Sequence, residues 1–317
     1  MRYGFGVDVG GTTIKLAYFD HEGNMLHKWE IPTNTANNGE AILPDIAAAI
    51  GGYLKENRIP DQDIIGIGVG VPGPVNDEGI VNKCVNLGWG QVDLHTTLSK
   101  LTGFGVKAGN DANVAALGEC WKGGGAGAKN MVMATLGTGI GGGIIVGGRL
   151  IAGAHGAGAE IGHIVVNKEE TESCGCGNRG CIEMYGSATG VVRVAKRYLA
   201  AYDGPSCLRG LENLQCKDVF DGAKAGDGAA LAILEQVYDL LGNFAATVCA
   251  VADPEVVVFG GGVSKAGQVL IDGISRYFQK YAFHACRGTR LTLASLGNDA
   301  GAYGAFKLAL DEFGAQY

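Results

Sequence analysis

The stretch FGVDVGGTTIKLAYF, residues 5–19, decides how the rest of the chain is interpreted. Apolar and small residues flank a Gly-Gly-Thr-Thr turn on both sides, which is typical of two strands joined by a tight turn. A similar pattern, MVMATLGTGIGGGIIVGG, returns at residues 131–148. The repetition predicts two related halves, each of which opens with a strand, a glycine turn and a second strand.

Helical and extended segments alternate in the remainder of the chain. Residues 25–31 predict a third strand, and IIGIGVGV at residues 64–71 predicts a buried one. The stripe Ile42, Ile46, Ile50 and Leu54 predicts a helix. The longest helix is expected from about residue 227 to 252, with a stripe formed by Leu231, Leu234, Val237, Leu241, Phe244 and Val248. Strands that alternate with helices indicate an α/β fold.

Composition and charge exclude several classes of protein. The 317 residues are 47% hydrophobic and carry a formal net charge of −7, which disfavours nucleic acid or an anionic membrane as a partner. No run approaches the roughly 20 apolar residues of a membrane span, and the first residues lack the apolar core of a signal peptide. The 55 glycines have no collagen-like period. We therefore expect a cytoplasmic α/β protein.

The segment EIGHIVVNKEETESCGCGNRGCIE, residues 160–183, gathers one histidine and three cysteines between two glutamates. A disulfide staple, a metal site and a reactive thiol are the competing interpretations. Nine cysteines, an odd number, in a chain without an export signal disfavour disulfides. A Cys-x-x-Cys redox pair is absent from the segment, whereas three thiolates and one imidazole have the composition of a structural zinc site. We predict zinc on His163, Cys174, Cys176 and Cys181, with KEETE, residues 168–172, as a solvated loop.

Two segments match the dinucleotide pattern G-x-G-x-x-G, at residues 68–73 and 137–142, but neither is expected to open a helix. The glycine turns instead predict a different kind of phosphate-binding site, in which backbone N–H groups and hydroxyls face phosphate oxygens. A third turn, FGGGVSK, precedes a helix. Each turn taken singly is an ordinary hairpin turn. Together they give the candidate nucleotide contacts Gly10, Gly11, Thr12, Thr13, Lys15, Gly137, Thr138, Gly139, Gly261 and Gly262.

Five motifs in this order resemble the ROK family of sugar kinases and repressors: DVGGTTIK, GNDANVAALGE, LGTGIGGG, the block EIGH…CGCGNRGCIE, and FGGGVS. The resemblance extends from about Tyr3 to Phe306. It implies an actin-like ATPase (ribonuclease H-like) fold with two α/β lobes around a central cleft. We expect lobes at residues 1–122 and 123–317, with the final helix packing back on the first lobe.

The resemblance also implies a reaction, the ATP-dependent phosphorylation of a hexose at its 6-hydroxyl, with glucose as the favoured sugar and Mg²⁺ beside the nucleotide. Asp111 matches the family's catalytic aspartate and is predicted to be the general base. Without the resemblance, a helix N-cap would be the preferred interpretation of this residue. The family places sugar contacts at positions that correspond here to Asn86, Asn110, Asp111, Glu160, His163 and Glu183.

Two alternatives stay open at this point. A sibling kinase of the family would act on fructose, mannose, allose or an N-acetylhexosamine, since one hydroxyl epimer is recognised by a few polar contacts. A sugar-responsive repressor would carry a DNA-binding module ahead of the kinase body, and DVGG begins here at Asp8. Members of the family are commonly homodimers or homotetramers, so we expect one of these states with the hexose and the nucleotide as partners.

Overall fold

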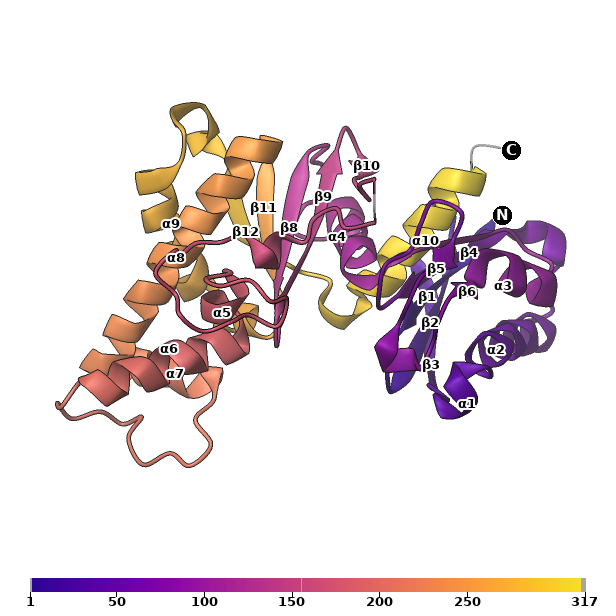
Figure 1. The fold of residues 1–317 in the computed structure, drawn as a ribbon. Coiled ribbons are helices and arrows are strands. Elements are labelled where there is room, and N and C mark those ends of the chain that lie inside the picture. The colour runs from indigo at the N-terminus through magenta and orange to yellow at the C-terminus, as the bar shows by residue number, and fades with distance from the viewer. Residues whose placement is uncertain (1, 155, 315–317) are drawn as a thin grey trace. The chain divides into compact units, whose positions relative to one another are not determined.

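The computed structural model describes residues 2–154 and 156–314, and the chain divides into two compact units (Figure 1). Unit 1 comprises Met1–Gly127, Leu150–Gly158 and Asn298–Tyr317, and unit 2 comprises Ala128–Arg149 and Ala159–Gly297. Chain ends far apart in sequence thus share unit 1. The lobe boundary expected near residue 122 stays a prediction.

Unit 1 is built on a five-stranded sheet with the order β3-β2-β1-β4-β7. The strands β1 (Tyr3–Val9), β2 (Thr13–Asp20) and β3 (Met25–Pro32) form an antiparallel meander. Strands β4 (Ile64–Val71) and β7 (Val106–Asn110) then add in parallel. The strands predicted from residues 5–19, 25–31 and 64–71 are therefore confirmed.

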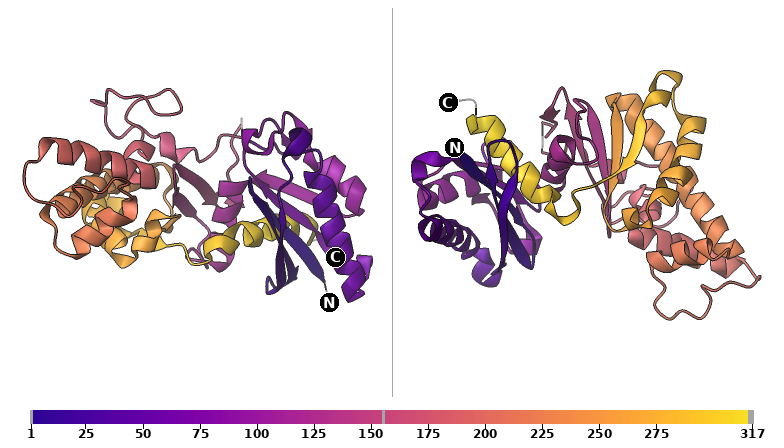
Figure 2. Two further views of the ribbon diagram at one scale, coloured as in Figure 1. Left: turned by 90° about the horizontal axis from the view of Figure 1, so that it is seen from below. Right: turned by 180° about the vertical axis from the view of Figure 1, so that it is seen from behind.

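The two faces of this sheet differ because β1 and β4 alternate apolar residues with glycine. Apolar side chains such as Phe5 and Ile67 pack in one core with α2 (Ile42–Asn57) and α3 (Leu94–Thr102). The opposite face contacts α10 (Ala300–Phe313), which also packs on α4 (Asp111–Lys122). Figure 2 shows α10, in yellow, beside the strands of unit 1. The shorter elements of this unit include α1 (Ala36–Gly39), β5 (Ile80–Val81) and β6 (Val92–Asp93).

The sheet of unit 2 has the same connectivity, in the order β10-β9-β8-β11-β12. Its strands are β8 (Met131–Leu136), β9 (Ile140–Val146), β10 (Arg149–Leu150), β11 (Val256–Gly260) and β12 (Arg290–Leu293). Strands β8 and β9 are antiparallel, and β11 and β12 continue in parallel. The repetition predicted from sequence is thus present as two sheets of equal strand order.

Most helices of unit 2 share one apolar core with its sheet. They are α5 (Glu183–Gly186), α6 (Ala188–Ala201), α7 (Cys216–Lys224), α8 (Gly228–Ala252) and α9 (Gln268–Tyr281). Helix α8 confirms the long helix predicted at residues 227–252. One member of its predicted stripe is wrong, because Leu231 is 48% exposed while Leu234 and Val237 are buried. Within residues 2–154 and 156–314, no helix has the length and apolar character needed to cross a membrane.

Candidate functional site

Asp111 lies where β7 ends and α4 begins, and its neighbour takes the capping role. Asn110 is the N-cap residue of α4, since its side-chain oxygen accepts the N–H groups of Ala112 and Asn113 at 3.1 and 3.2 Å. The Asn110 amide nitrogen also donates to the Gly73 carbonyl at 3.2 Å. The N-cap interpretation of Asp111 is therefore wrong, and its carboxylate accepts the N–H of the neighbouring Ala112 at 2.8 Å.

The surroundings of Asp111 change its acidity. Burial raises the pKa of this carboxyl, the Ala112 N–H lowers it, and the charge of Asp8 raises it, with a net increase above the ordinary value. Asp8 was not among the predicted site residues. It is the last residue but one of strand β1, just before the glycine turn, and burial raises its pKa despite Lys15, whose Nζ lies 3.6 Å away. The sequence indicated this residue only by a carboxylate near the end of an otherwise apolar strand.

The first glycine turn, residues 10–13, is closed by backbone and hydroxyl contacts within unit 1. The Gly10 N–H donates to the Thr13 carbonyl at 3.0 Å, and the Thr33 hydroxyl donates to the Gly10 carbonyl at 2.7 Å. Gly11 and Thr12 at its tip are exposed. Asn86 lies against Gly11, with its backbone oxygen 3.7 Å from where a β-carbon on Gly11 would be. The structure thus places Asn86 beside this turn.

The second glycine turn, residues 137–139, and the first residue of the strand after it are hydrogen-bonded to helix α6 and to Glu183. The Ala188 N–H donates to the Gly137 carbonyl at 2.8 Å, and the Thr189 hydroxyl donates to the Thr138 carbonyl at 2.7 Å. Glu183 accepts the Ile140 N–H at 3.0 Å. Strand β9 follows the turn directly, which confirms that the G-x-G-x-x-G match at residues 137–142 opens no helix. The match at residues 68–73 likewise leads into a turn and the short strand β5.

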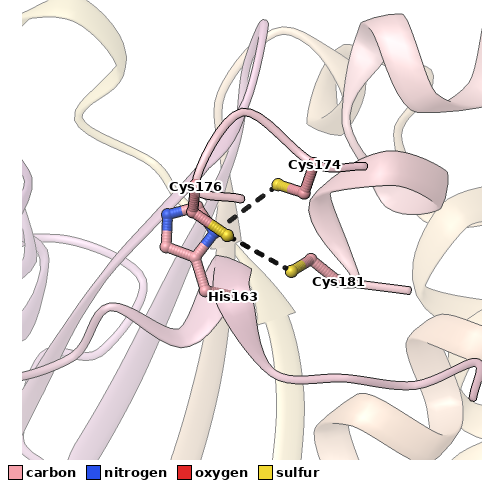
Figure 3. A group of neighbouring side chains, drawn as sticks. All are labelled: His163, Cys174, Cys176 and Cys181. Atoms are coloured by element: carbon pink, nitrogen blue, oxygen red, sulfur yellow. Dashed lines mark hydrogen bonds between the residues drawn. The ribbon is translucent and has the colours of Figure 1, made fainter. Parts of the chain in front are cut away.

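The histidine and three cysteines predicted as metal ligands converge in unit 2 (Figure 3). Their four candidate donor atoms all lie within 4.8 Å of one another. The Sγ atoms of Cys176 and Cys181 are 3.7 Å apart, and Cys174 Sγ is 3.8 Å from His163 Nδ1. Two sulfurs on one tetrahedral zinc, at about 2.3 Å each, lie roughly 3.8 Å apart, so the spacing fits this ion. All nine cysteines are free, and no disulfide competes for these thiols.

Glutamates flank the cluster as predicted, but in two different environments. Glu160 is exposed, and one of its oxygens lies 4.0 Å from His163 Nε2, the ring nitrogen that faces away from the sulfurs. Glu183 is half-buried and reaches both the second glycine turn and Cys174, whose Sγ lies 3.4 Å from its second oxygen. The predicted sugar contacts thus form two groups, with Glu160, His163 and Glu183 in unit 2 and Asn86, Asn110 and Asp111 in unit 1.

The prediction that residues 168–172 form a solvated loop is wrong for Glu170. Its side chain is 1% exposed and lies against Arg193 and Arg197 of α6. These arginines lower the pKa of the Glu170 carboxyl strongly, together with a hydrogen bond from Tyr185. The two arginines lie more than 20 positions further along the chain, so the local acidic run gave no indication of them. Glu169 and Glu172 are exposed, as predicted.

The third glycine turn borders a cavity of about 970 Å³, which is lined wholly by residues of unit 2. Gly261 has φ +83°, and a β-carbon there would lie 2.5 Å from the Leu136 carbonyl oxygen, so the turn requires glycine. A short 3₁₀ helix, Val263–Ala266, follows before α9. Helices α6 and α7 form the other walls, which sequence reasoning missed because their lining residues resemble the ordinary faces of amphipathic helices. These include Ala188, Val192, Lys196, Cys216, Phe220 and Lys224.

The two sheets of equal order, each with a glycine turn between its first strands, define a protein of the actin-like ATPase (ribonuclease H-like) fold. The chain belongs to the ROK family, whose model matches residues 4–312. A glucokinase of Halalkalibacterium halodurans is 42% identical over 308 residues, which cover 96% of this chain and 93% of that protein.

Two further comparisons bear on the type of kinase. The crystal structure of a ROK family glucokinase from Streptomyces griseus in complex with glucose and AMPPNP has a TM-score of 0.74. It is 32% identical, and the alignment covers 98% of this chain and 99% of that one. An N-acetyl-D-glucosamine kinase of Aliivibrio salmonicida is 29% identical, over 96% of this chain and 98% of that protein. The similarity to glucokinases is thus the stronger of the two.

Proposed function

We propose that this protein transfers the terminal phosphoryl group of ATP to the 6-hydroxyl of glucose. The similarity to glucokinases along nearly the whole chain supports this function. The observation that carries the chemistry is the half-buried Asp111 carboxylate at the junction of β7 and α4, whose capping role is taken by Asn110.

Asp111 acts as the general base. Its carboxylate accepts the proton of the attacking hydroxyl while the new oxygen–phosphorus bond forms and ADP leaves. Burial raises its pKa, which makes the ionised carboxylate a better proton acceptor than an ordinary aspartate. Asn110 keeps Asp111 in place, because the oxygen and the nitrogen of the Asn110 side chain are both hydrogen-bonded to the surrounding backbone.

The glycine turns and the cavity of unit 2 bind the nucleotide. The cavity has a predominantly apolar lining from α6 and α7, and several lysines at its rim, which suits a base with a charged tail. Gly262 at the third turn borders it directly, and the second turn is hydrogen-bonded to the first residues of α6. The first turn, with Thr12, Thr13 and Lys15, is the corresponding phosphate contact of unit 1.

Two metal ions are part of the proposal. The spacing of His163, Cys174, Cys176 and Cys181 fits zinc in a closed structural site, which would fix the loop that leads into Glu183, the first residue of α5. Magnesium, when bound with the nucleotide, offsets the charge on the phosphates. We assign Asp8 to hold it, since this carboxylate is mostly buried and close enough to Asp111 to raise its pKa.

Each unit, taken by itself, carries candidate contacts for the hexose. Glu160, Glu183 and the outer nitrogen of His163 are the contacts of unit 2, and Asn86 and Asn110 those of unit 1. Carboxylates suit this task because each accepts more than one charge-assisted hydrogen bond. Asn110 has only one amide hydrogen left for the sugar, since the structure uses its oxygen and its other N–H.

An ADP-release assay with Mg²⁺ and ATP over glucose, mannose, fructose and N-acetylglucosamine tests the function. We expect the highest kcat/KM with glucose. A higher value with another of these sugars would reassign the substrate and keep the reaction. Absence of turnover with every sugar, in protein that is folded and contains zinc, would overturn the proposal.

A further inference from the structure

A cluster of charges around the buried Glu170 side chain connects the loop that carries the metal ligands to helix α6. We call it the acid–arginine cluster, formed by Glu170, Glu172, Arg193 and Arg197. Arg197 donates to both oxygens of Glu170, at 2.8 and 3.0 Å, and also to Glu172. Arg193 Nη2 lies 2.6 Å from Glu170, and Arg193 Nε donates to Glu172 at 3.0 Å. Each acid thus contacts both arginines.

Neighbouring groups complete the coordination of Glu170. The Tyr185 hydroxyl donates to it at 2.6 Å, and the N–H groups of Thr171 and Glu172 donate at 2.9 Å each. Arg193 also lies over the Tyr185 ring, with its guanidinium carbon 5.5 Å from the ring centre. A carboxylate that is 1% exposed needs this many partners, because burying an unpaired charge costs several kcal/mol. The loop therefore has one well-defined position against α6.

Helix α6 also forms a wall of the proposed nucleotide cavity. Val192, Lys196 and the two arginines line that cavity. The first turn of the same helix holds the second glycine turn through Thr189 and Ala188. A displacement of α6 would therefore change the cavity and the glycine turn together.

We propose that Glu170 is a positioning residue for the nucleotide, which it never touches. Through Arg193 and Arg197 it holds α6 in the place where the helix shapes the cavity and supports the turn at Gly137–Gly139. A buried ion pair contributes little net stability compared with apolar packing. Its main effect can instead be to hold two elements in one relative position. This inference rests on the proposed function, since it takes the cavity of unit 2 as the nucleotide site.

The variant Glu170→Gln tests the inference, with Glu169→Gln as the matched control. Both changes remove one negative charge from the same loop, but Glu169 is exposed and has no contact with either arginine among the described interactions. Calorimetry with AMPPNP and, separately, with glucose gives the affinities of folded protein. For Glu170→Gln we expect nucleotide affinity to fall by about threefold to tenfold, with glucose affinity and zinc content unchanged. The control should match the wild type.

If Glu170 contributed only to the stability of the fold, the variant Glu170→Gln would give a different result. Partial unfolding would lower the active fraction and the apparent kcat, and would leave both affinities unchanged. Unchanged or tighter nucleotide binding by Glu170→Gln overturns the inference. If that variant does not fold, Tyr185→Phe replaces it, since this change removes a hydroxyl that donates to Glu170 and Tyr185 is not among the residues that line the cavity. Where both variants fold, the double variant should lose no more nucleotide affinity than either single one, because all act through one contact.

A third variant separates this inference from the proposed function. Val192→Trp fills the cavity but leaves all four members of the acid–arginine cluster in the chain, and it should abolish measurable AMPPNP binding. If Val192→Trp binds normally, the cavity is not the nucleotide site, and the nucleotide assignment of the cavity and the positioning role of Glu170 fail together. If Val192→Trp loses binding but Glu170→Gln does not, only the positioning role of Glu170 is wrong.

Discussion

A methyl group built on Gly68 would lie 1.6 Å from the carbonyl oxygen of Ala305, so strand β4 and helix α10 approach each other backbone to backbone. The same holds for Gly6, where a β-carbon would lie 2.0 Å from the Ala302 carbonyl oxygen. Glycines alternate with apolar residues along β1 and β4, and they form the face that receives the last helix. From the sequence, we expected the glycines to form turns and to contact ligands. Many of them instead allow this close packing of strand and helix.

Gly68→Ala should destabilise the protein by about 3 kcal/mol, because overpacking a core contact of this kind forces the helix away from the sheet. Urea unfolding followed by circular dichroism measures the loss. Gly51→Ala is the control, since Gly51 lies exposed in α2 and a β-carbon there meets nothing within 4 Å. That change should stabilise by about 0.5–1 kcal/mol, as alanine does in a helix. Equal effects of the two changes would contradict the packing account.

Local patterns predicted the elements well and the long-range partners poorly. The alternation in residues 5–19 and the stripe from Ile42 to Leu54 are properties of single elements, and the structure confirms both. The metal ligands were found because residue type and spacing alone specify them. Glu170 and Asp8 were missed, since the arginines that bury the one and the carboxylate near the other come from distant parts of the chain.

Glu170→Gln should also alter how stability depends on pH. The arginines hold the pKa of Glu170 below its ordinary value of 4.5, so its ionised form stabilises the folded state above that pH. This contribution is lost as the pH falls through the folded-state pKa, where the carboxyl becomes protonated. Free energies of unfolding from urea titrations should therefore differ between wild type and variant by about 2–4 kcal/mol near pH 7, and the difference should begin to shrink below pH 4.5. A gap that is constant with pH would contradict the ion-pair account.

Cys176→Ser should lower the zinc content of purified, tag-free protein well below one equivalent and reduce its melting temperature. Serine cannot replace a thiolate as a zinc ligand of comparable strength, and a structural site loses most of its affinity with one ligand. Cys207→Ser is the control, because Cys207 is also exposed and free but lies outside the cluster. Elemental analysis and thermal unfolding measure both changes. Stoichiometric zinc in Cys176→Ser would remove this residue from the ligand set.

The acid limb of the rate profile should reflect the raised pKa of Asp111. A general base must be ionised, so kcat/KM for glucose declines as the pH falls through the pKa of this carboxyl. Burial and the charge of Asp8 place that pKa above the ordinary aspartate value of 3.8. We therefore expect the decline to begin at a higher pH than an exposed aspartate would give. Zinc content measured at each pH excludes metal loss as the cause, and full activity down to pH 3.8 would refute the assignment.

Asp111→Asn gives the most direct test of the chemistry. The amide keeps the size of the side chain and its contact with the Ala112 N–H, and Asn110 continues to cap α4. The fold and the affinity for glucose should therefore stay close to those of the wild type. Turnover should fall by about 10²–10⁴-fold, because an amide cannot accept the proton of the attacking hydroxyl. Glucose calorimetry beside the ADP-release assay separates these effects, and turnover within tenfold of the wild type would show that another group takes the proton.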